Sequence, residues 1–382
     1  MRVAFFSNFV IHHQLPFCQE MLRLTKGNFV FVATEPFCEA RRSFGYEDMD
    51  GKYDFVLPAY QSDAMKNEAL QIAKTCDIAI FGSAPEFYLV ERMKLGKVTF
   101  RYCERPLKEG RLRLLRPKTL YMMLKTHTQF MFKPLYLLCA SSYTYGDCAL
   151  VGGYWGRAYK WGYFPEVMQY DIAELLQKKA ENNIIKILWA GRLLGWKHPE
   201  YVIDVAENLK NDGYRFELNI IGNGDLETTL AEQIEKRNLC SCVKMLGSMN
   251  PQRVRTYMEE ANIYLFTSDR NEGWGAVLNE SMNSGCAVIT NSAIGSAPYL
   301  INNGVNGLIY REGDVSDLYK KVKQCMDDRE YCEKLGAEAY RTITEVWSAR
   351  VAAERILHIS EQLLKNKKVF YESGPCSKAG WR

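Results

Sequence analysis

The chain has 382 residues, of which 47% are hydrophobic and 25% charged, and its formal net charge is +4. This length exceeds one ordinary hydrophobic core, so we expect two domains of roughly 150 to 200 residues each. The composition is typical of a soluble α/β protein, and no stretch approaches the roughly 18 to 20 apolar residues of a membrane span.

The first part of the chain alternates short apolar runs with helical patterns. Candidate strands lie at 3–7, 29–33, 77–82, 97–102 and 137–141. Strand–helix alternation of this kind predicts a parallel sheet wrapped by helices. The N-terminal run MRVAFFSNFV has one basic residue and no small-residue cleavage site, so it indicates a buried first strand rather than a signal peptide.

The alternation restarts after a polar, helix-forming stretch at 165–183, which we interpret as an interdomain connection. Candidate strands follow at 184–191, 215–222, 243–246, 263–268 and 286–291. Helical patterns lie between and after them at 199–211, 225–237, 251–260, 275–283 and 315–326. Two Rossmann-like halves in series predict a ligand cleft between domains.

These patterns divide the chain into four parts. We expect an N-terminal Rossmann-like domain at 1–168 and a C-terminal Rossmann-like domain at 169–345. A last amphipathic helix, within 346–366, is expected to pack back on the N-terminal domain. The remaining tail, 367–382, is expected to be poorly ordered.

Twelve cysteines are scattered along the chain, mostly inside apolar periodic segments, and none forms a CxxC pair. We interpret them as reduced core cysteines of a cytosolic protein rather than as a disulfide scaffold.

The stretch EGWGAVLNE, from Glu272 to Glu280, holds two glutamates that do not share a helix face, because eight steps of about 100° leave them about 80° apart. Gly273 and Gly275 lie between a strand and a helix that starts near Ala276. Glycines let backbone amides approach a ligand, and a helix start attracts anions. The glutamates would contact opposite ends of an extended ligand with phosphate between them, as in a nucleotide-sugar. The alternative is two glutamates with no joint role.

Three further loops follow strands of the second half. AGRLLGWKHP (190–199) places Arg192 and Lys197 together, where they could neutralise a diphosphate. The glycine turn IIGNGD (220–225) and the loop SAIGSAPYLINNGVNGLIY (292–310) also end strands. All of these loops fall at one edge of a parallel sheet, as ligand-binding loops do in doubly wound folds.

GR-x4-K, the IIGNGD turn, EGWGAVLNE and NG-x-NGLIY occur in this order and at normal spacing. Together they resemble the donor domain of the retaining glycosyltransferases with the GT-B fold, family 4 of the glycosyltransferases, over about 185–345. SNFVIHHQLPF, RYCERPLKEG and KWGYFPE are similar to a bacterial branch that builds capsule, lipopolysaccharide O-antigen or other exopolysaccharides. The resemblance implies an α/β GT-B fold, with two Rossmann-like domains facing each other across a cleft. It also implies that 1–168 is the acceptor-binding domain and that 169–345 is the nucleotide-sugar donor domain.

The resemblance also implies roles for individual residues. Arg192 and Lys197 would hold the donor diphosphate, Glu272 would contact the donor sugar, and Glu280 would bind ribose. The rest of the implied donor-binding set comprises Gly222, Leu246, Gly273, Gly275, and the amides of Ala276 and Val277. Leu246, next to Gly247, would lie beside the base.

The N-terminal half departs from the family pattern at one position. Many members have a histidine after the fourth strand, where this chain has Glu104 and Arg105. His12 and His13 instead follow the first strand. Either set could shape the acceptor site, so we include Glu104, Arg105 and His13 among the candidate catalytic residues. The alternative for the histidines is packing at a helix entry.

The resemblance implies a metal-independent, retaining hexosyltransferase that moves a sugar from a UDP- or GDP-sugar to a saccharide acceptor, expected to be lipid-linked. Charge grows on the leaving diphosphate, which Arg192 and Lys197 would stabilise. We expect no cofactor and no metal, and we do not assign metal binding to the DxD sequence Asp48–Met49–Asp50. The alternatives are a catalytically silent nucleotide-sugar-binding subunit of a polysaccharide assembly complex and a GT-B-fold nucleotide-sugar epimerase or hydrolase.

Basic residues are concentrated in one segment. Twelve Lys or Arg and two Glu lie between Arg92 and Lys133, which leaves a balance of −6 elsewhere. Within it, residues 111–138 interleave basic with apolar side chains, as interfacial segments on anionic lipid do. A core helix with a solvated basic face is the alternative, and no RNA-binding motif accompanies the segment. We expect a cytoplasmic protein, peripheral on the inner face of the plasma membrane, with no nucleic-acid partner.

Overall fold

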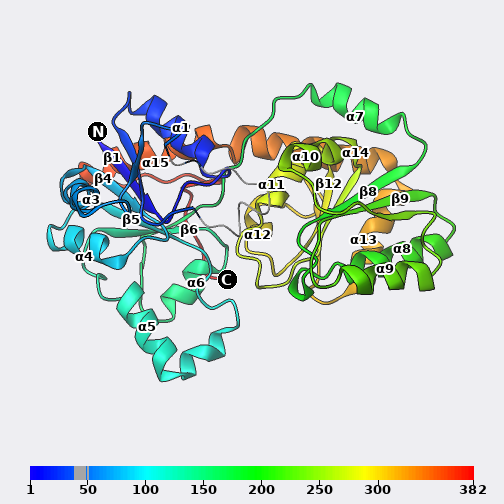
Figure 1. The fold of residues 1–382 in the computed structure, drawn as a ribbon, viewed down its shortest axis with the longest axis horizontal. Coiled ribbons are helices and arrows are strands. Elements are labelled where there is room, and N and C mark those ends of the chain that lie inside the picture. Colours follow the sequence, from blue (N-terminus) through cyan, green and yellow to red (C-terminus); the bar gives the residue numbers. More distant parts are fainter. Residues whose placement is uncertain (38–48, 50) are drawn as a thin grey trace. The chain divides into compact units, whose positions relative to one another are not determined.

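The computed structural model describes every residue except 38–48 and 50 (Figure 1). The chain divides into two compact units, Met1–Glu166 together with Trp347–Arg382, and Val167–Val346. Each unit is built on a parallel sheet whose strands alternate with helices along the chain. The predicted α/β class with two Rossmann-like halves is confirmed.

The sheet of the first unit is wholly parallel. Its described strands are β1 (Val3–Ser7), β2 (Phe29–Ala33), β3 (Val56–Pro58), β4 (Ile78–Phe81), β5 (Thr99–Cys103), β6 (Leu135–Cys139) and β7 (Ala158–Lys160). They lie in the order β3-β2-β1-β4-β5-β6-β7. β1 and β4 are buried along their whole length, which explains why they are unbroken apolar runs. The three-residue strands β3 and β7 were not predicted, because they are too short to show a hydrophobic period.

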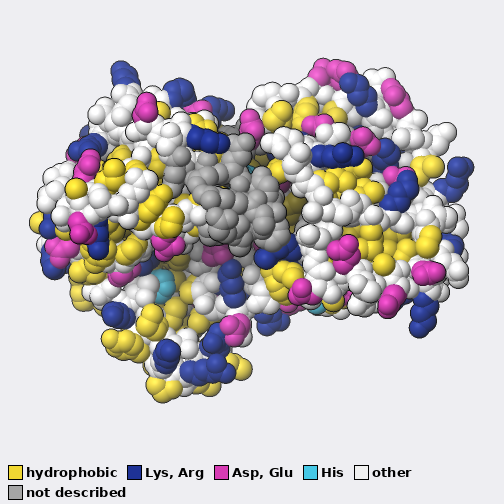
Figure 2. All heavy atoms as spheres, viewed as in Figure 1, with side chains coloured by type: hydrophobic (Ala, Val, Ile, Leu, Met, Phe, Trp, Pro, Cys, Tyr) yellow, Lys and Arg dark blue, Asp and Glu magenta, His cyan; other side chains and the backbone are white. Residues whose placement is uncertain are grey.

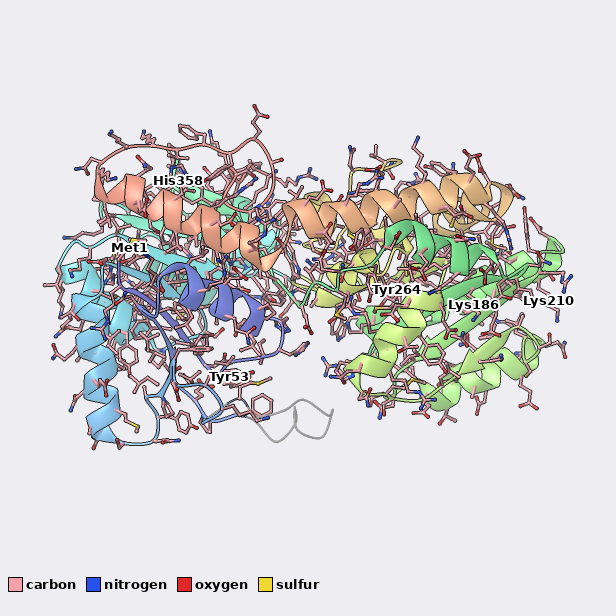
Figure 3. All side chains as sticks on the ribbon, turned by 90° about the horizontal axis from the view of Figure 1, so that it is seen from above. Met1, Tyr53, Lys186, Lys210, Tyr264 and His358 are labelled. Atoms are coloured by element: carbon pink, nitrogen blue, oxygen red, sulfur yellow. The ribbon has the colours of Figure 1, made fainter. Side chains whose placement is uncertain are left out.

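The helices of the first unit come from both ends of the chain. They are α1 (Leu15–Leu24), α3 (Asp63–Thr75), α4 (Glu86–Lys94), η1 (Arg111–Leu115), α5 (Pro117–His127), α6 (Thr144–Ala149) and α15 (Ala349–Leu364). Although α15 follows the second unit in sequence, it packs against α1, and Figures 1 and 3 show the two helices side by side. The N-terminus of α15 is capped by Ser348, whose side chain accepts a hydrogen bond from the backbone of Val351.

The segment after α15 corrects one prediction. We expected a poorly ordered tail, but Cys376 and Ala379 are only 1% and 2% exposed. Lys378 pairs antiparallel with Tyr159 of β7, and the backbone N–H of Lys160 donates to Ser377 O at 2.7 Å. The tail is held because β7 is an edge strand, whose free backbone groups can pair with another segment.

The sheet of the second unit is also parallel. Its described strands are β8 (Ile185–Ala190), β9 (Phe216–Ile221), β10 (Val243–Met245), β11 (Ile263–Phe266), β12 (Ala287–Asn291) and β13 (Leu308–Tyr310). They lie in the order β10-β9-β8-β11-β12-β13, so the chain reverses its direction of sheet growth between β8 and β11. Such a reversal is where doubly wound sheets bind ligands.

Helices cover both faces of this second sheet. They are α7 (Ile172–Ala180), η2 (Gly195–Lys197), α8 (Glu200–Asn211), α9 (Glu227–Lys236), α10 (Pro251–Glu260), α11 (Ala276–Asn283), α12 (Ala297–Leu300), α13 (Val315–Asp327), α14 (Arg329–Arg341) and η3 (Thr342–Val346). No helix in the described part of the chain is long and apolar enough to cross a membrane.

The stretch 165–183, interpreted as a connection, is in part a packed helix of the second unit. Lys179 of α7 is 4% exposed, and its Nζ donates to the carbonyls of Ala261 and Ser284, both at 2.7 Å, and of Met258 at 3.2 Å. Three carbonyl acceptors satisfy the three donors of a buried ammonium. A lysine therefore fixes α7 to the unit, which its polar sequence did not indicate.

The cysteines in the described residues are all unpaired, and most of them are buried. Their placement agrees with the interpretation as reduced core side chains.

Candidate active site

The loops that carry the predicted cations and the first glutamate leave two paired strands. β8 and β11 are neighbours, and their carboxyl ends lie at the same edge of the sheet. The loop 191–199, with Arg192 and Lys197, follows β8, and the loop 267–275, with Glu272, follows β11. Arg192 is exposed at this edge. The predicted charges therefore lie on loops that leave the sheet at its topological switch point.

Hydrogen bonds tie these two loops together. Trp189 Nε1 donates to Thr267 Oγ1 at 2.8 Å, and Thr267 Oγ1 donates to the carbonyl of Lys197 at 2.6 Å. The backbone N–H of Asp269 donates to Trp196 O at 2.9 Å. The position of Lys197 is therefore set by a buried Trp–Thr pair in the sheet as well as by its own loop.

Lys197 and Glu272 form an ion pair in this site. Lys197 Nζ lies 2.6 Å from Glu272 Oε2, and each side chain is 14% exposed. Ser268 Oγ donates to the same carboxylate oxygen at 3.0 Å, and the ring of Trp196 lies 4.5 Å from Nζ. The cation and carboxylate predicted for different parts of one ligand are thus in direct contact, which the sequence did not reveal.

Gly275 opens α11 in a conformation that requires glycine. Its φ is 77°, and a Cβ there would lie 2.3 Å from Phe266 Cζ. Ala276 and Val277 are the first two residues of α11, so their amides have no acceptor within the helix. With the positive end of the helix dipole, these amides can bind an anion.

Glu280 lies one turn into α11, and its charge acts on the same tyrosine, Tyr264, as the charge of Glu272. Burial raises the pKa of the Glu280 carboxyl, and Arg255 acts in the opposite direction. Tyr264, labelled in Figure 3, is buried in β11 and donates to Ala190 O at 3.0 Å. Burial raises the pKa of Tyr264 well above its usual range, and the charges of Glu280 and Glu272 add to this. Both glutamates therefore lie near one phenol at the switch point.

Gly222 has a packing role in the structure. Its φ is 138°, and a Cβ there would lie 1.8 Å from Gly191 O. Its backbone N–H donates to Gly247 O at 2.8 Å, and the N–H of Leu246 is also bonded within the sheet edge. The glycine turn thus lets the loop after β9 lie against the loop after β8. The backbone N–H of Gly222 is already hydrogen-bonded within the protein.

The tryptophan of EGWGAVLNE is a structural anchor that sequence reasoning left without a role. Trp274 is fully buried, and its Nε1 donates to Asn279 Oδ1 at 2.8 Å. Its carbonyl accepts a hydrogen bond from Ser296 Oγ in the following loop. Gly273 beside it is also buried. In the sequence, the only signal for this anchoring role was a large indole side chain between two glycines.

His198, next to Lys197, is another residue that the sequence did not single out. It has left-handed backbone with φ 49°, and its ring stacks on Tyr201 at 4.6 Å. Its Nδ1 lies 2.8 Å from Glu200 Oε1, and its Nε2 lies 3.7 Å from Asp269 Oδ2. The hydrogen bond to Glu200 raises the pKa of His198, with further support from both carboxylates. His198 therefore connects the two loops of the site.

In the first unit, the two sets proposed to shape an acceptor site are joined by a tyrosine. His13 stacks on Tyr163 with ring centroids 4.4 Å apart, and His12 lies edge-on to His13 at 4.8 Å. The Tyr163 hydroxyl donates to Glu104, which is also 2.6 Å from Lys108 Nζ. Tyr163 belongs to KWGYFPE, but no role was assigned to it.

Arg105 and Glu104 are neighbours in sequence but have different partners. Its Nε lies 3.1 Å from Asp147 Oδ2, and its guanidinium lies 4.7 Å from the ring of Tyr143. Asp147 is fully buried and also pairs with Arg111 Nε at 2.9 Å. A buried carboxylate needs such partners, so the structure gives Arg105 an anchoring contact.

Metal independence remains a prediction. Among the described residues, no group of three or more His, Cys, Asp or Glu is placed to hold a metal ion. Asp48 and Asp50 of the DxD sequence lie outside the described residues.

Comparison with known proteins finds a family match within the second unit. Residues 171–342 match the family of glycosyl transferases group 1. This matched region is therefore similar to a group 1 glycosyl transferase.

Curated relatives match the chain over part of their length. The chain is 34% identical over 146 residues to the amylovoran biosynthesis glycosyltransferase AmsK of Erwinia amylovora, covering 37% of this chain and 36% of that relative. It is 27% identical over 149 residues to the putative colanic acid biosynthesis glycosyltransferase WcaL of Escherichia coli K12, covering 38% and 36%. It is 30% identical over 162 residues to the N-acetylgalactosamine-N,N'-diacetylbacillosaminyl-diphospho-undecaprenol 4-alpha-N-acetylgalactosaminyltransferase of Campylobacter jejuni, covering 41% and 42%. The matches therefore span well under half of these relatives.

Solved structures resemble the chain over nearly its whole length. HepE of Anabaena in complex with UDP gives a TM-score of 0.66 at 16% identity and covers 96% of this chain and 99% of its own. A glycosyltransferase of Rickettsia africae gives 0.67 at 15% identity with the same coverage. The lipopolysaccharide outer core galactosyltransferase WaaB gives 0.66 at 16% identity and covers 94% and 100%. The chain thus has the GT-B fold, as predicted.

Proposed function

We propose that this chain is a retaining glycosyltransferase that moves a sugar from a nucleoside-diphosphate-sugar to a saccharide acceptor in bacterial surface polysaccharide biosynthesis. The observation that carries the proposal is the Lys197–Glu272 pair beside the start of α11, on the loops that follow the neighbouring strands β8 and β11. Arg192 lies on the same loop as Lys197. Relatives named for amylovoran and colanic acid biosynthesis support the pathway class. The UDP complex of HepE supports a nucleotide donor.

The cations of the site are suited to a leaving diphosphate. As the bond between sugar and phosphate breaks, negative charge grows on the diphosphate, so Arg192, Lys197 and the α11 amides stabilise the transition state more than the ground state. Lysine has three donors, so Lys197 can bind a phosphate oxygen while it keeps its contact with Glu272. Because these groups supply the positive charge, we expect transfer to proceed without an added metal ion.

The two glutamates are suited to hydroxyl groups on either side of that diphosphate. An ionised carboxylate accepts hydrogen bonds at both oxygens, so it can hold neighbouring hydroxyls of a sugar. Glu272, beside Lys197, would hold the transferred sugar, and Glu280, one turn into α11, would hold the ribose. In a retaining reaction the acceptor hydroxyl attacks the face that the diphosphate leaves. A donor phosphate oxygen can then take the acceptor proton.

The first unit is the proposed acceptor side. His13, Tyr163 and Glu104 form a connected polar and aromatic cluster near the carboxyl ends of β1 and β5. The C. jejuni relative is named for a diphospho-undecaprenol substrate, which supports a lipid-linked acceptor. Such an acceptor and a nucleotide-sugar donor would place the reaction at the cytoplasmic face of the membrane.

Replacement of Glu272 by Gln tests the reaction, and replacement of Lys197 by Ala tests the donor site. We expect Glu272→Gln to lower release of nucleoside diphosphate from the cognate donor by about 100-fold or more, because a transition-state contact is lost. We expect Lys197→Ala to weaken binding of UDP or GDP by about tenfold or more, since a charge-assisted contact is removed. Binding is measured by calorimetry across a panel of nucleotides and nucleotide-sugars.

Lys236→Ala is the matched control, because Lys236 is exposed on α9 of the same unit. It should bind nucleotide as the unaltered protein does. Activity in EDTA should match activity in buffer, and strict dependence on Mn²⁺ would contradict the metal-independent mechanism. If no nucleotide binds, or if Glu272→Gln retains full activity, the proposed function is wrong.

A further inference from the structure

The segment 111–133 of the first unit exposes large apolar side chains. Leu112 and Leu115 of η1 are each 82% exposed, and Phe132 in the loop after α5 is 91% exposed. Leu120 and Tyr121 of α5 are also exposed. Figure 2 shows yellow side chains gathered with dark-blue ones over the lobe that contains α5 in Figure 1. Most of the large apolar side chains of this segment therefore lie outside the hydrophobic core.

These side chains are exposed although the segment is firmly attached to its unit. On its inner side, Met123 of α5 is 5% exposed and packs in a small apolar cluster with Leu107 and Val151. His127 Nδ1 lies 3.3 Å from the Tyr154 hydroxyl. The same segment thus has an inner face that is packed and an outer face that is apolar and open.

Charged contacts fix both ends of the segment. Arg111 pairs with the buried Asp147 at the start of η1. The guanidinium of Arg157 donates to the carbonyls of Met131 and Lys133, which fixes the loop that carries Phe132. Large apolar side chains held outward on an attached scaffold indicate an interaction surface.

The charge of the surface indicates what it binds. Residues 111–138 contain six Lys or Arg and no Asp or Glu. Arg116, Lys118 and Lys133 are exposed on the outer side, next to the apolar residues. Arg113 pairs with Glu109 at 2.5 Å, so it contributes less positive charge. A second copy of this chain would bring the same positive charge to the contact, which disfavours self-association through this surface.

We propose that residues 111–133 dock on an anionic lipid bilayer. Leu112, Leu115 and Phe132 would enter the boundary between headgroups and acyl chains, and Arg116, Lys118 and Lys133 would contact headgroup phosphates. An interfacial segment combines buried apolar area with attraction of basic residues to anionic lipid, at about 1 kcal/mol per Lys or Arg. The proposal does not depend on the proposed sugar transfer, because docking needs no substrate.

Flotation of the full chain with vesicles tests the charge part of the proposal. We expect it to float with phosphatidylcholine vesicles that contain phosphatidylglycerol and to float much less with phosphatidylcholine alone. The variant R116Q/K118Q/K133Q should lose about tenfold or more in affinity for the anionic vesicles. The matched control is K236Q/K320Q/K334Q, which removes the same charge from exposed positions of the second unit and should bind as the unaltered chain does.

A second variant tests the apolar part. L112S/L115S/F132S should retain its thermal midpoint, because these side chains are highly exposed, and should lose most binding to anionic vesicles. The control F370S, at a side chain 73% exposed, should float normally. Failure of the unaltered chain to float with either vesicle, or normal flotation of both triple variants, would overturn the proposal. Concentration-dependent dimers lost in L112S/L115S/F132S, or duplex RNA binding without flotation, would instead assign the surface to self-association or to nucleic acid.

Discussion

At the scale of single residues, Gly275 connects the fold of the second unit to its proposed chemistry. The α11 amides can point toward a ligand only if the chain turns sharply after Trp274. The turn uses a left-handed backbone at Gly275, against the ring of Phe266. Gly275 therefore serves the packing of the sheet edge as well as the proposed anion site.

Replacement of Gly275 by Ala should destabilise the protein. The new Cβ would meet Phe266 Cζ at 2.3 Å and would adopt a positive φ, so we expect a loss of about 2–4 kcal/mol. Gly213→Ala is the control, because Gly213 has φ 80° but no atom within 4 Å, and should cost only about 1 kcal/mol. Thermal midpoints of both variants provide the measurement. Equal shifts would show that Phe266 moves aside freely.

His198 gives the second unit a pH-dependent contact. Because Glu200 raises the pKa of His198 in the folded state, protonation favours folding. This stabilisation is fully present below the ordinary pKa of histidine and is lost as pH rises through the raised folded value. His198→Asn keeps a residue that tolerates left-handed backbone and removes the charge.

We therefore expect the thermal midpoint of His198→Asn to fall below that of the unaltered protein most strongly near pH 6. The difference should shrink as pH rises toward about 8. Scans across this range measure it. A difference that grows with pH would show that the contact with Glu200 does not favour protonated His198.

At the scale of elements, the sequence predicted the long and periodic parts of the chain. Strands such as β1 and β11 are continuous apolar runs because parallel strands are buried on both faces. The loops of the candidate site could also be located, because the carboxyl ends of parallel strands share one edge. The three-residue strands β3, β7 and β13 were missed, because they contain less than two alternations of side chains. β10 is equally short, but it was predicted as the four-residue strand 243–246.

Side-chain partners were the least predictable feature of the site. Lys197 and Glu272 are 75 residues apart in sequence, and their contact depends on the pairing of β8 with β11. Lys179 resembled a surface residue, yet it is buried because distant carbonyls surround its ammonium. Tyr163 joins His13 to Glu104 across three separate segments. Such contacts follow from tertiary structure, which no local pattern encodes.

At the scale of the whole molecule, the first unit depends on a chain segment that comes after the second unit. The strand β7 pairs with the C-terminal segment through Lys378, and Ala379 packs in the core cluster of the first unit. Because domains generally fold as separate cores, damage to this segment should affect the first unit and spare the second unit.

The pair Ala379→Asp and Lys378→Asp tests this dependence with neighbouring residues. Ala379 is 2% exposed, so a carboxylate there is buried without a partner, and we expect a loss of about 2–4 kcal/mol. Lys378 is exposed, and its replacement should change stability by less than about 0.5 kcal/mol. Hydrogen exchange should rise in β6 and β7 of Ala379→Asp and stay unchanged in β8 and β11, with UDP or GDP binding retained. Faster exchange in both units, or loss of nucleotide binding, would show instead that the two units share their stability.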